Sequence, residues 1–319
     1  MNFTKENLNL ENGLKKEWII TNGLGGYSSS TIIGANTRKY HGLLVAPLTP
    51  PARRFLILSK LDESIERDGK KYDLYTNVCK EYISHGYKYQ EKFIKEELPT
   101  FKYKVEDVEI EKTICMDYGK NTVGVYYKIK NGKKDIKLTL APIINYRDFH
   151  QMNTEHYFNI QQSVRKSKVR LVIDNNSQTP VYMHVSDGEY KEHYNDTFMH
   201  MFYIEEEKRG FYPEENHSVT GVYEISVKAK QEKNISFVCS LEENIEEIDV
   251  QDLINKERNR IQKVIKQSEL IDETKIKKTK KEKDRDELIK TYLIATDNFV
   301  VYRPHFGLHT LIAGYHWFL

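Results

Sequence analysis

Polar side chains of the kinds that bind sugars gather in one early stretch of the sequence. The residues concerned are Asn22, Gly25, Gly26, Tyr27, Arg38 and His41. Their amide, phenol, guanidinium and imidazole groups supply hydrogen-bond donors, acceptors and a ring for stacking. Glycine also reaches backbone angles closed to other residues. The stretch is therefore consistent with a polyol or sugar site, and also with a plain tight turn.

The glycines of this stretch do not complete a dinucleotide fingerprint. Gly23-Leu24-Gly25-Gly26 begins like G-x-G-x-x-G, but the third glycine would fall at Ser28. No long helical pattern follows that could place a helix N-terminus against a phosphate. The stretch therefore gives no reason to expect a nucleotide.

No acidic residue stands in a motif typical of a catalytic acid or base. Asp148 lies between Arg147 and His150, and we expect it to pair with Arg147 or with a loop amide. Arg209 follows Glu205–Glu207, which we expect to be a strand end with a structural ion pair. We therefore count Arg147, Asp148, His150 and Arg209 as candidates for substrate binding or a domain interface, and not for catalysis.

The sequence predicts neither a metal site nor a cofactor. The 11 histidines include no H-x-x-H or H-x-x-x-H pair on an obvious helix, and Cys79, Cys115 and Cys239 form no C-x-x-C spacing. No phosphate-binding loop, G-x-S-x-G elbow or Cys–His pattern appears.

Charge and hydropathy limit the partners and the compartment. The net charge of +2 gives no reason to expect nucleic acid or a membrane surface as a partner. The first residues lack the apolar region of a signal peptide, and no run has the apolar length of a membrane span. An odd number of scattered cysteines fits a reducing compartment, so we expect the protein to be cytoplasmic.

The wider sequence predicts the strands that must position these residues. Trp18–Ile20 and Ile32–Ile33 predict two short strands with polar loops, and Leu43–Ala46 is apolar again. From Phe55 to about Leu241 apolar residues recur with a period of two, without an intervening helical pattern. Many short strands with polar turns are typical of an antiparallel sandwich. The predicted fold class is mainly β, with one large antiparallel β-sandwich.

Two hairpins are predicted inside this region. Val123–Lys130 and Ile136–Leu140 flank Asn131-Gly132, which is a strong hairpin signal. Tyr223–Val227 and Ile235–Cys239 form a similar pair joined by a polar segment. Both pairs are expected to lie side by side in one sheet.

After Leu241 the apolar residues recur at three, four and seven positions, which indicates an amphipathic helix. Lys275–Arg285 is dense in charge and indicates a solvated linker or helix face rather than a basic binding patch. A helical pattern resumes from Leu288 to Val301. We predict a sandwich domain over residues 1–245, a helical and charged linker over 246–285, and the incomplete start of a helical domain over 286–319.

The opening stretch is similar to a known family. Glu17–Ala46, EWIITNGLGGYSSSTIIGANTRKYHGLLVA, resembles the opening of the glycogen debranching enzymes of bacterial and archaeal type, which have amylo-α-1,6-glucosidase activity. Further similar segments follow in the family's order, and they are Leu58–Glu63 (LSKLDE), Pro142–His150 (PIINYRDFH), Tyr203–Phe211 (YIEEEKRGF) and Ala313–Phe318 (AGYHWF). The resemblance covers the chain from Glu17 to its end.

The resemblance implies a supersandwich-like N-terminal domain followed by an α/α-barrel that carries the catalysis. It implies a glycoside hydrolase of glycogen catabolism that acts on glycogen, limit dextrin or related α-glucans. Such a reaction needs one carboxylic acid and one carboxylate, in the inverting arrangement that the resemblance implies. Because Ala313–Phe318 resembles the start of the barrel, we expect both groups beyond residue 319 and no activity from this chain alone.

Two interpretations of the candidate residues stay open. The segments Asn22–Tyr27 and Arg38–His41 border the glucan where the sandwich meets its barrel, with Trp317 as a stacking face, or they only brace that interface. A different class of function, a stand-alone and non-catalytic glucan-binding or interaction module, would have the same sandwich.

Overall fold

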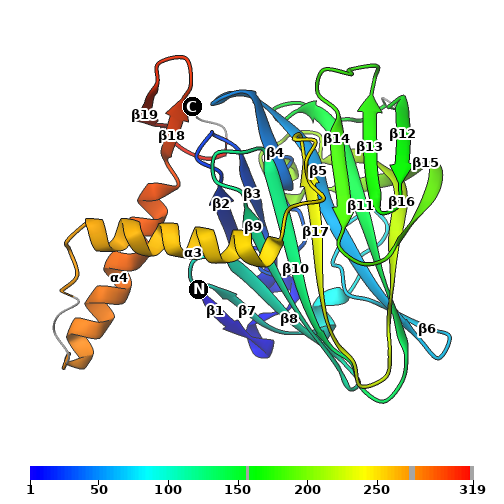
Figure 1. The fold of residues 1–319 in the computed structure, drawn as a ribbon, viewed down its shortest axis with the longest axis horizontal. Helices are drawn as coiled ribbons and strands as arrows, with labels where there is room; N and C mark the ends of the chain where they lie inside the picture. The colour runs from blue at the N-terminus through cyan, green and yellow to red at the C-terminus, as the bar shows by residue number, and fades with distance from the viewer. Residues whose placement is uncertain (156–157, 273–276, 317–319) are drawn as a thin grey trace.

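The alternating strands build two antiparallel sheets that pack face to face (Figure 1). The structure is a computed structural model that describes residues 1–155, 158–272 and 277–316. Within them, one sheet has nine strands, in the order β1 (Asn2–Thr4), β7 (Gln90–Lys95), β8 (Pro99–Val105), β9 (Val108–Met116), β10 (Thr122–Lys130), β17 (Glu232–Ser240), β14 (Val181–Val185), β13 (Lys168–Ile173) and β12 (Ile160–Arg165).

The second sheet of the described residues has eight strands. Its order is β15 (Glu189–Phe202), β16 (Glu214–Val227), β11 (Ile136–Asp148), β5 (Ala52–Arg67), β4 (Gly42–Thr49), β3 (Tyr27–Thr31) and β2 (Glu17–Thr21), with β6 (Lys70–Asp73) paired to β5. Short helical turns lie at Lys5–Asn7, α1 (Leu10–Gly13) and Gly86–Tyr89.

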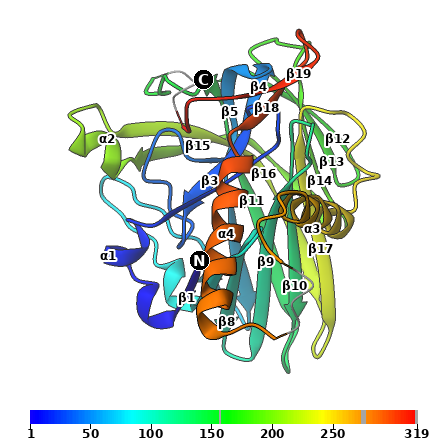
Figure 2. The same ribbon diagram turned by 90° about the vertical axis from the view of Figure 1, so that its left-hand side faces the viewer.

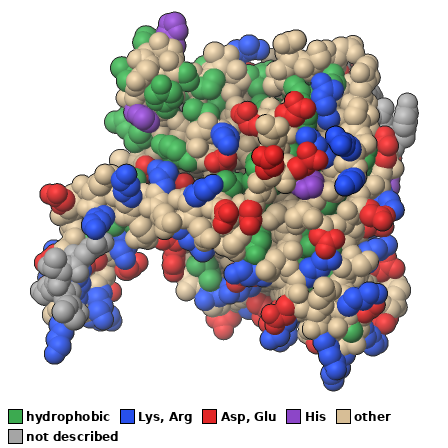
Figure 3. Space-filling model, viewed as in Figure 1, with side chains coloured by type: hydrophobic (Ala, Val, Ile, Leu, Met, Phe, Trp, Pro, Cys, Tyr) green, Lys and Arg blue, Asp and Glu red, His purple; other side chains and the backbone are tan. Residues whose placement is uncertain are grey.

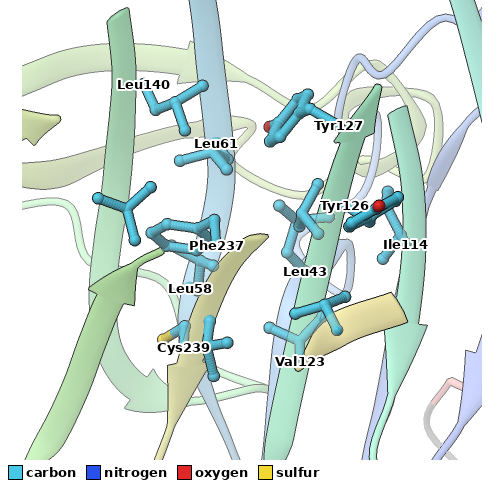
Figure 4. Packing of buried hydrophobic residues seen from close by; sticks show 14 of the residues in the cluster. Leu43, Leu58, Leu61, Ile114, Val123, Tyr126, Tyr127, Leu140, Phe237 and Cys239 are labelled. Atoms are coloured by element: carbon cyan, nitrogen blue, oxygen red, sulfur yellow. The ribbon is translucent and has the colours of Figure 1, made fainter. Parts of the chain in front are cut away.

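Apolar side chains from both sheets fill the space between them (Figure 4). Leu58 and Leu140 of the eight-stranded sheet are fully buried, as are Val123 and Phe237 of the nine-stranded sheet. Each such burial contributes about 1.5–3 kcal/mol. The prediction of a mainly β sandwich is confirmed.

The two predicted hairpins are wrong, because both connections carry the chain from one sheet to the other. β10 pairs with β9 and β17, whereas β11, which follows Asn131-Gly132, pairs with β5 and β16. β16 and β17 likewise belong to different sheets. Alternation identifies the buried face of a strand, but both sheets offer such a face. The pattern therefore does not say which neighbour a strand pairs with.

The two crossings lie against each other and are hydrogen-bonded. The backbone N–H of Asn131 donates to the carbonyl of Gln231 at 2.9 Å, and that of Lys230 donates to Gly132 at 2.6 Å. The side-chain amide of Asn131 also donates to Lys228 at 2.8 Å. A Cβ at Gly132 would lie 2.2 Å from Oδ2 of Asp107, so a larger residue there would have to displace the Asp107 side chain. Asn131-Gly132 is thus a turn of the expected composition in an unexpected connection.

The second strand of the opening stretch begins earlier than predicted. β2 contains Trp18–Ile20 as expected, but β3 is built from the serine-rich run, and Ile32–Ile33 lie in the turn after it. Two of the three serine hydroxyls have partners: Oγ of Ser29 donates to the carbonyl of Trp18 at 2.8 Å, and Oγ of Ser30 donates to Oδ1 of Asn36 at 2.9 Å. Serines that find such partners can be buried in a strand.

The helix predicted after Leu241 is confirmed as α3 (Val250–Gln267), which begins at Asp249. The carboxylate of Asp249 accepts from the N–H of Gln251 at 2.8 Å, as an N-cap residue does. The apolar face of α3, including Ile254 and Ile261, is buried. α3 crosses the outer face of the nine-stranded sheet over β9, β10 and β17 (Figure 1).

The next helix, α4 (Lys280–Asp297), projects away from the sandwich (Figure 1). A capping box between Thr279 and Glu282 starts it. Arg260 of α3 donates to Asp297 at 2.6 Å and ties the far end of α4 to α3. No helix in the described part of the chain is both long and apolar enough to cross a membrane.

The helical pattern predicted through Val301 is wrong beyond Asp297. The chain there forms a hairpin of β18 (Val300–Arg303) and β19 (Leu308–Leu311). The described residues after α4 show no barrel, and the predicted division at residues 245 and 285 stays a prediction. Exposed apolar side chains gather on this hairpin (Figure 3), which carries Phe306, Leu308 and Leu311, and on α4 the side chains of Leu288 and Tyr292 are exposed as well.

The strand end predicted at Glu205–Glu207 is a short helix, α2 (Ile204–Lys208), which lies on the opposite side from α3 in Figure 2. The expected ion pair is present, since Arg209 lies 3.3 Å from the buried carboxylate of Glu206. The N–H of Glu205 donates to the carbonyl of Thr37 at 2.9 Å. α2 therefore supports the chain just before Arg38.

Candidate functional site

The loop between β2 and β3 is organised by the side chain of Asn22, which is fully buried. Its Oδ1 accepts from the N–H groups of Leu24 at 3.0 Å and Gly26 at 2.9 Å. Its Nδ2 donates to Lys120 at 2.8 Å and to Asn121 at 3.1 Å. The amide of Asn22 is thus engaged on both sides by the protein itself.

The glycines of this loop are required by its own packing. Gly25 has φ +93°, and a Cβ there would lie 2.7 Å from the carbonyl oxygen of Pro51. The outer side of the loop contacts the C-terminal segment, because the carbonyl of Gly23 accepts from the N–H of Tyr302 at 2.7 Å. Oγ1 of Thr21 donates to Oδ1 of Asn298 at 3.2 Å. The loop therefore joins the sandwich to residues 298–302.

Arg38 and His41 both contact Glu17 on β2. Nε of Arg38 donates to Oε1 of Glu17 at 2.8 Å, and Nη2 lies 3.8 Å from Glu205. Nδ1 of the fully buried His41 accepts from the N–H of Thr37 at 3.1 Å, so the ring proton lies on Nε2, 3.6 Å from Glu17. Burial opposes the ionisation of Glu17, but His41 and Arg38 outweigh it and lower its pKa to about 2.

A group of rings surrounds a buried cation on the outer face of the eight-stranded sheet. We call this group the aromatic socket, and its residues are Tyr27, Tyr40, His41, Arg54 and Phe149. Arg54 is fully buried, and burial lowers the pKa of its guanidinium. The guanidinium carbon lies 5.5 Å from the ring centre of Phe149 and 5.9 Å from that of Tyr27. Among the described residues, Nε and Nη2 of Arg54 have no hydrogen-bond partner.

The socket holds Tyr315 and His316. Nη1 of Arg54 donates to the carbonyl of His316 at 2.7 Å, and its guanidinium carbon lies 4.9 Å from the ring centre of Tyr315. The His316 ring is stacked on Tyr40 with 13° between the planes, and its Nε2 lies 3.0 Å from Oγ of Ser29. Burial and the neighbouring His41 lower the pKa of His316 to about 3, so the ring is neutral.

A buried ion pair fixes the loop that carries Arg38 and His41. Arg147 and Glu215 are almost fully buried and make two hydrogen bonds, one of them 2.8 Å long. The hydroxyl of Tyr203 donates to Glu215 at 2.5 Å. Nη2 of Arg147 donates to the carbonyl of Lys39 at 2.8 Å, and Nη1 donates to Phe149 at 3.2 Å. Arg147 thus links β11 to the loop and to the socket.

His217 completes this cluster as a buried neutral base. Its Nε2 lies 3.2 Å from the hydroxyl of Tyr203, and its Nδ1 lies 3.1 Å from the amide nitrogen of Asn145. Burial lowers the pKa of His217 to about 4, although the charge of Glu215 acts in the opposite direction. The cluster is therefore assembled with its histidine uncharged.

The neutral state of His217 predicts a loss of stability in mild acid. An unfolded histidine binds a proton below its ordinary pKa of 6.5, whereas folded His217 does so only near 4. The stability that comes from the neutral ring is complete above pH 6.5 and is lost as the pH falls toward 4. We expect His217→Gln to reduce the slope of unfolding free energy against pH by up to about 1.4 kcal/mol per pH unit.

Urea unfolding at several pH values between 7 and 4 measures this slope. His85→Gln is the matched control, because the His85 side chain is exposed, and it should leave the slope unchanged. Equal slopes for the wild type and His217→Gln would show that His217 does not contribute to the pH dependence.

The remaining candidate residues lie around the same loop. Oδ1 of Asp148 accepts from the N–H of His150 at 2.9 Å, which is the predicted bond to a loop amide, and Arg147 pairs with Glu215 instead. Nδ1 of His150 lies 3.3 Å from the hydroxyl of Tyr40. Arg209 is close enough to Tyr40 to affect its pKa, which burial raises. Trp317 lies outside the described residues.

Sequence reasoning missed Arg54 and the partners of Arg147. Arg54 lies two positions before the buried Leu56 on β5. This spacing places both side chains on the same face of the strand, and it could have indicated that Arg54 is buried. Glu215 and His217 also lie two positions apart on β16. Their partner Tyr203 lies outside this strand, and the local sequence does not indicate that they interact with it. Within the described ranges, no group of three or more His, Cys, Asp or Glu side chains is arranged to hold a metal ion.

The sequence matches the family described as glycogen debranching enzyme N terminal over residues 16–234. No curated protein matches it. Among solved structures it is similar to a protein described as a kojibiose phosphorylase from the human microbiome, with 11% identity and a TM-score of 0.32, over 90% of this chain and 32% of that chain.

A bacterial glucoamylase complexed with acarbose is similar with 12% identity and a TM-score of 0.42, over 83% of this chain and 36% of that chain. A polysaccharide lyase is similar with 9% identity and a TM-score of 0.34, over 62% of this chain and 30% of that chain. The chain spans about a third of the length of these solved structures.

Proposed function

The chain belongs to the family of glycogen debranching enzyme N-terminal domains, and from this we propose that it forms the sandwich of an enzyme that hydrolyses α-1,6-glucosidic branch points. The substrate is glycogen, limit dextrin or a related α-glucan. The sandwich supports a catalytic helical barrel that follows it and borders the glucan bound there. A cytoplasmic location is part of this proposal, and the free thiols Cys79, Cys115 and Cys239 support it.

The main observation in support of this proposal is that Tyr315 and His316 are bound in the aromatic socket. These residues belong to the segment that resembles the start of the family's barrel. The two loops that the sequence singled out, Asn22–Tyr27 and Arg38–His41, both contact residues 298–316. Because the sandwich contacts residues 298–316 at several points, it fixes the position of the domain that we propose to follow them. The exposed apolar side chains of α4 and its hairpin support a barrel as the part that covers them.

The carboxylates of the sandwich support a division of labour between the two parts. Each buried carboxylate in the described part of the chain is paired with a lysine or arginine, and the pairs involve Asp62, Glu63, Glu206, Glu214, Glu215, Glu257 and Asp286. A general acid needs a proton at working pH, and an adjacent cation favours its loss, although at Glu257 burial outweighs Arg260 and raises the pKa. We therefore assign the acid and the base to the barrel.

Glucose release from a branched limit dextrin tests the proposal. We expect residues 1–319 alone to release none, and a protein in which the barrel follows them to release glucose from α-1,6 branch points. Glucose release by residues 1–319 that a single Asp or Glu substitution abolishes would place the chemistry in the sandwich. No release by the longer protein would contradict the proposed reaction.

The same assay separates a bordering loop from a bracing loop. In the longer protein, His41→Ala should lower kcat/KM for the dextrin while the protein stays folded, if the loop positions groups at the glucan. A lower melting temperature with unchanged kcat/KM would show that the loop only braces the junction.

A further inference from the structure

A surface groove of about 470 Å3 lies beside β15, away from the aromatic socket and sharing no residue with it. One wall is the turn Cys79–Tyr82, and the other is the bulge of β15 between Phe198 and Met201. Its volume is within the range of about 300–1,000 Å3 that is typical of ligand pockets. Its lining includes Tyr75, Lys80, Tyr82, Phe198, Met199 and His200.

The two walls of the groove are held together by backbone hydrogen bonds. The N–H of Cys79 donates to the carbonyl of Tyr82 at 2.8 Å and closes the turn. The N–H of Lys80 donates to His200 at 3.3 Å, and that of Phe202 donates to Val78 at 2.8 Å. The groove is therefore formed before any ligand binds, which reduces the entropy lost on binding.

The groove leaves aromatic and apolar side chains open to water. Tyr82 is 59% exposed and Met199 is 42% exposed. Phe198 is fixed from behind, since its ring packs edge-on against the buried ring of His217, with 6.5 Å between the ring centres. Gathered exposed apolar side chains of this kind mark interaction sites on soluble proteins.

The groove carries charges of both signs, because Glu81 lines it beside Lys80 and the carboxylate of Glu214 lies at its edge. Lys80 lies 2.9 Å from Glu214, and Nδ1 of His200 lies 3.0 Å from the same carboxylate. The hydrogen bond from Lys80 lowers the pKa of Glu214, which therefore carries a negative charge between the two basic groups. With the carboxylates of Glu81 and Glu214 beside Lys80, the groove has no preference for a phosphate or for another anion.

A hexose ring matches this combination of groups. It has an apolar face of C–H groups that can lie on an aromatic ring, and hydroxyls around its rim that both donate and accept hydrogen bonds. The hydroxyls of Tyr75 and Tyr82 and the ammonium group of Lys80 provide partners for such a rim. Amphipathic rings with polar tips suit a ligand that is apolar on one side and wet on the other.

We propose that this groove is a surface site for an α-glucan chain, with Tyr82 and Phe198 as the rings that contact sugar. The inference rests on the proposed α-glucan substrate and adds a second place of contact on the sandwich. The segment that follows α2 lies between this site and the loop that carries Arg38, because Nζ of Lys39 is 5.8 Å from the ring centre of Phe211 and Tyr212 is close enough to Lys80 to affect its pKa. A branched glucan held at the groove would be kept near the sandwich while one of its branches enters the catalytic site.

Electrophoresis of residues 1–319 in native gels with and without glycogen tests the site. We expect glycogen to slow the wild-type chain, and Tyr82→Ala to weaken the apparent binding by roughly ten-fold. Tyr292→Ala is the matched control, because Tyr292 is 64% exposed on α4 and far from the groove in sequence and position. A gel with a β-linked glucan of similar size tests the preference for the α-linkage.

Retardation by glycogen that Tyr82→Ala loses and Tyr292→Ala keeps supports the site. Equal retardation of the wild type and Tyr82→Ala, or none for the wild type, overturns it. Equal retardation by the β-linked glucan overturns the assignment to α-glucans. Glucose release by the longer protein is measured separately, so a failure of the groove and a failure of the proposed reaction give different results.

Discussion

Arg54→Ala is expected to destabilise the chain by about 3–5 kcal/mol, as much as truncation of a buried aromatic side chain. Arg54 is fully buried, and its guanidinium fills the space between Tyr27, Phe149 and Tyr315. Alanine would leave a cavity among these rings and would remove the donor to the carbonyl of His316. Urea unfolding followed by circular dichroism measures the loss.

The neighbouring residue gives a matched control for this experiment. Arg53 is exposed, and Arg53→Ala should change the unfolding free energy by no more than about 0.5 kcal/mol. Arg54→Met separates volume from charge, because methionine retains much of the side chain's length and removes the desolvated cation. We expect it to cost less than alanine. Equal unfolding free energies for Arg54→Ala and Arg53→Ala would mean that the socket does not depend on its cation.

Glu215→Gln is expected to cost about 3–5 kcal/mol, because it leaves the charge of Arg147 buried without a counter-charge. Glu215 is fully buried and accepts hydrogen bonds from Arg147, Tyr203 and the N–H of Asn153. Glutamine has the same shape but lacks the charge, and its amide nitrogen would face donors. The same unfolding measurement applies.

Glu207→Gln on α2 is the control for this substitution, since Glu207 is exposed and should tolerate the change. Joint replacement of Arg147 and Glu215 by methionine should cost less than the sum of the two single replacements, because neither charge is then left alone. Additive single effects would show that the two side chains do not act as a pair.

The sequence predicted the sandwich well because each strand has one buried face. Apolar residues at every second position therefore mark the strands. The alternation around Val123 and Tyr223 gave the strands correctly. It could not give their neighbours, since pairing across 100 residues leaves no local trace. The turn Asn131-Gly132 was identified for its composition, yet its composition is equally suited to a crossing between sheets.

The candidate site was predicted in part, for similar physical reasons. Arg38 and His41 stood out as polar residues between apolar strands, and the structure shows how they are paired. The socket could not be predicted, because Arg54, Phe149 and His316 come from three distant parts of the chain. Their contacts are a property of the folded chain and not of any segment.

The crossing of the chain between sheets also determines when the fold can be completed. β10 pairs with β17, and the hydroxyls of Thr122 and Ser240, 118 positions apart, lie 2.6 Å from each other. Loops of this length close slowly compared with local hairpins. During synthesis one edge of β10 therefore stays unpaired until more than 100 further residues have left the ribosome. Until then this edge can pair with another strand. A chain that ended before Glu232 would keep that edge open, so this sandwich folds late and as a whole, with its interior closed by one of its last strands.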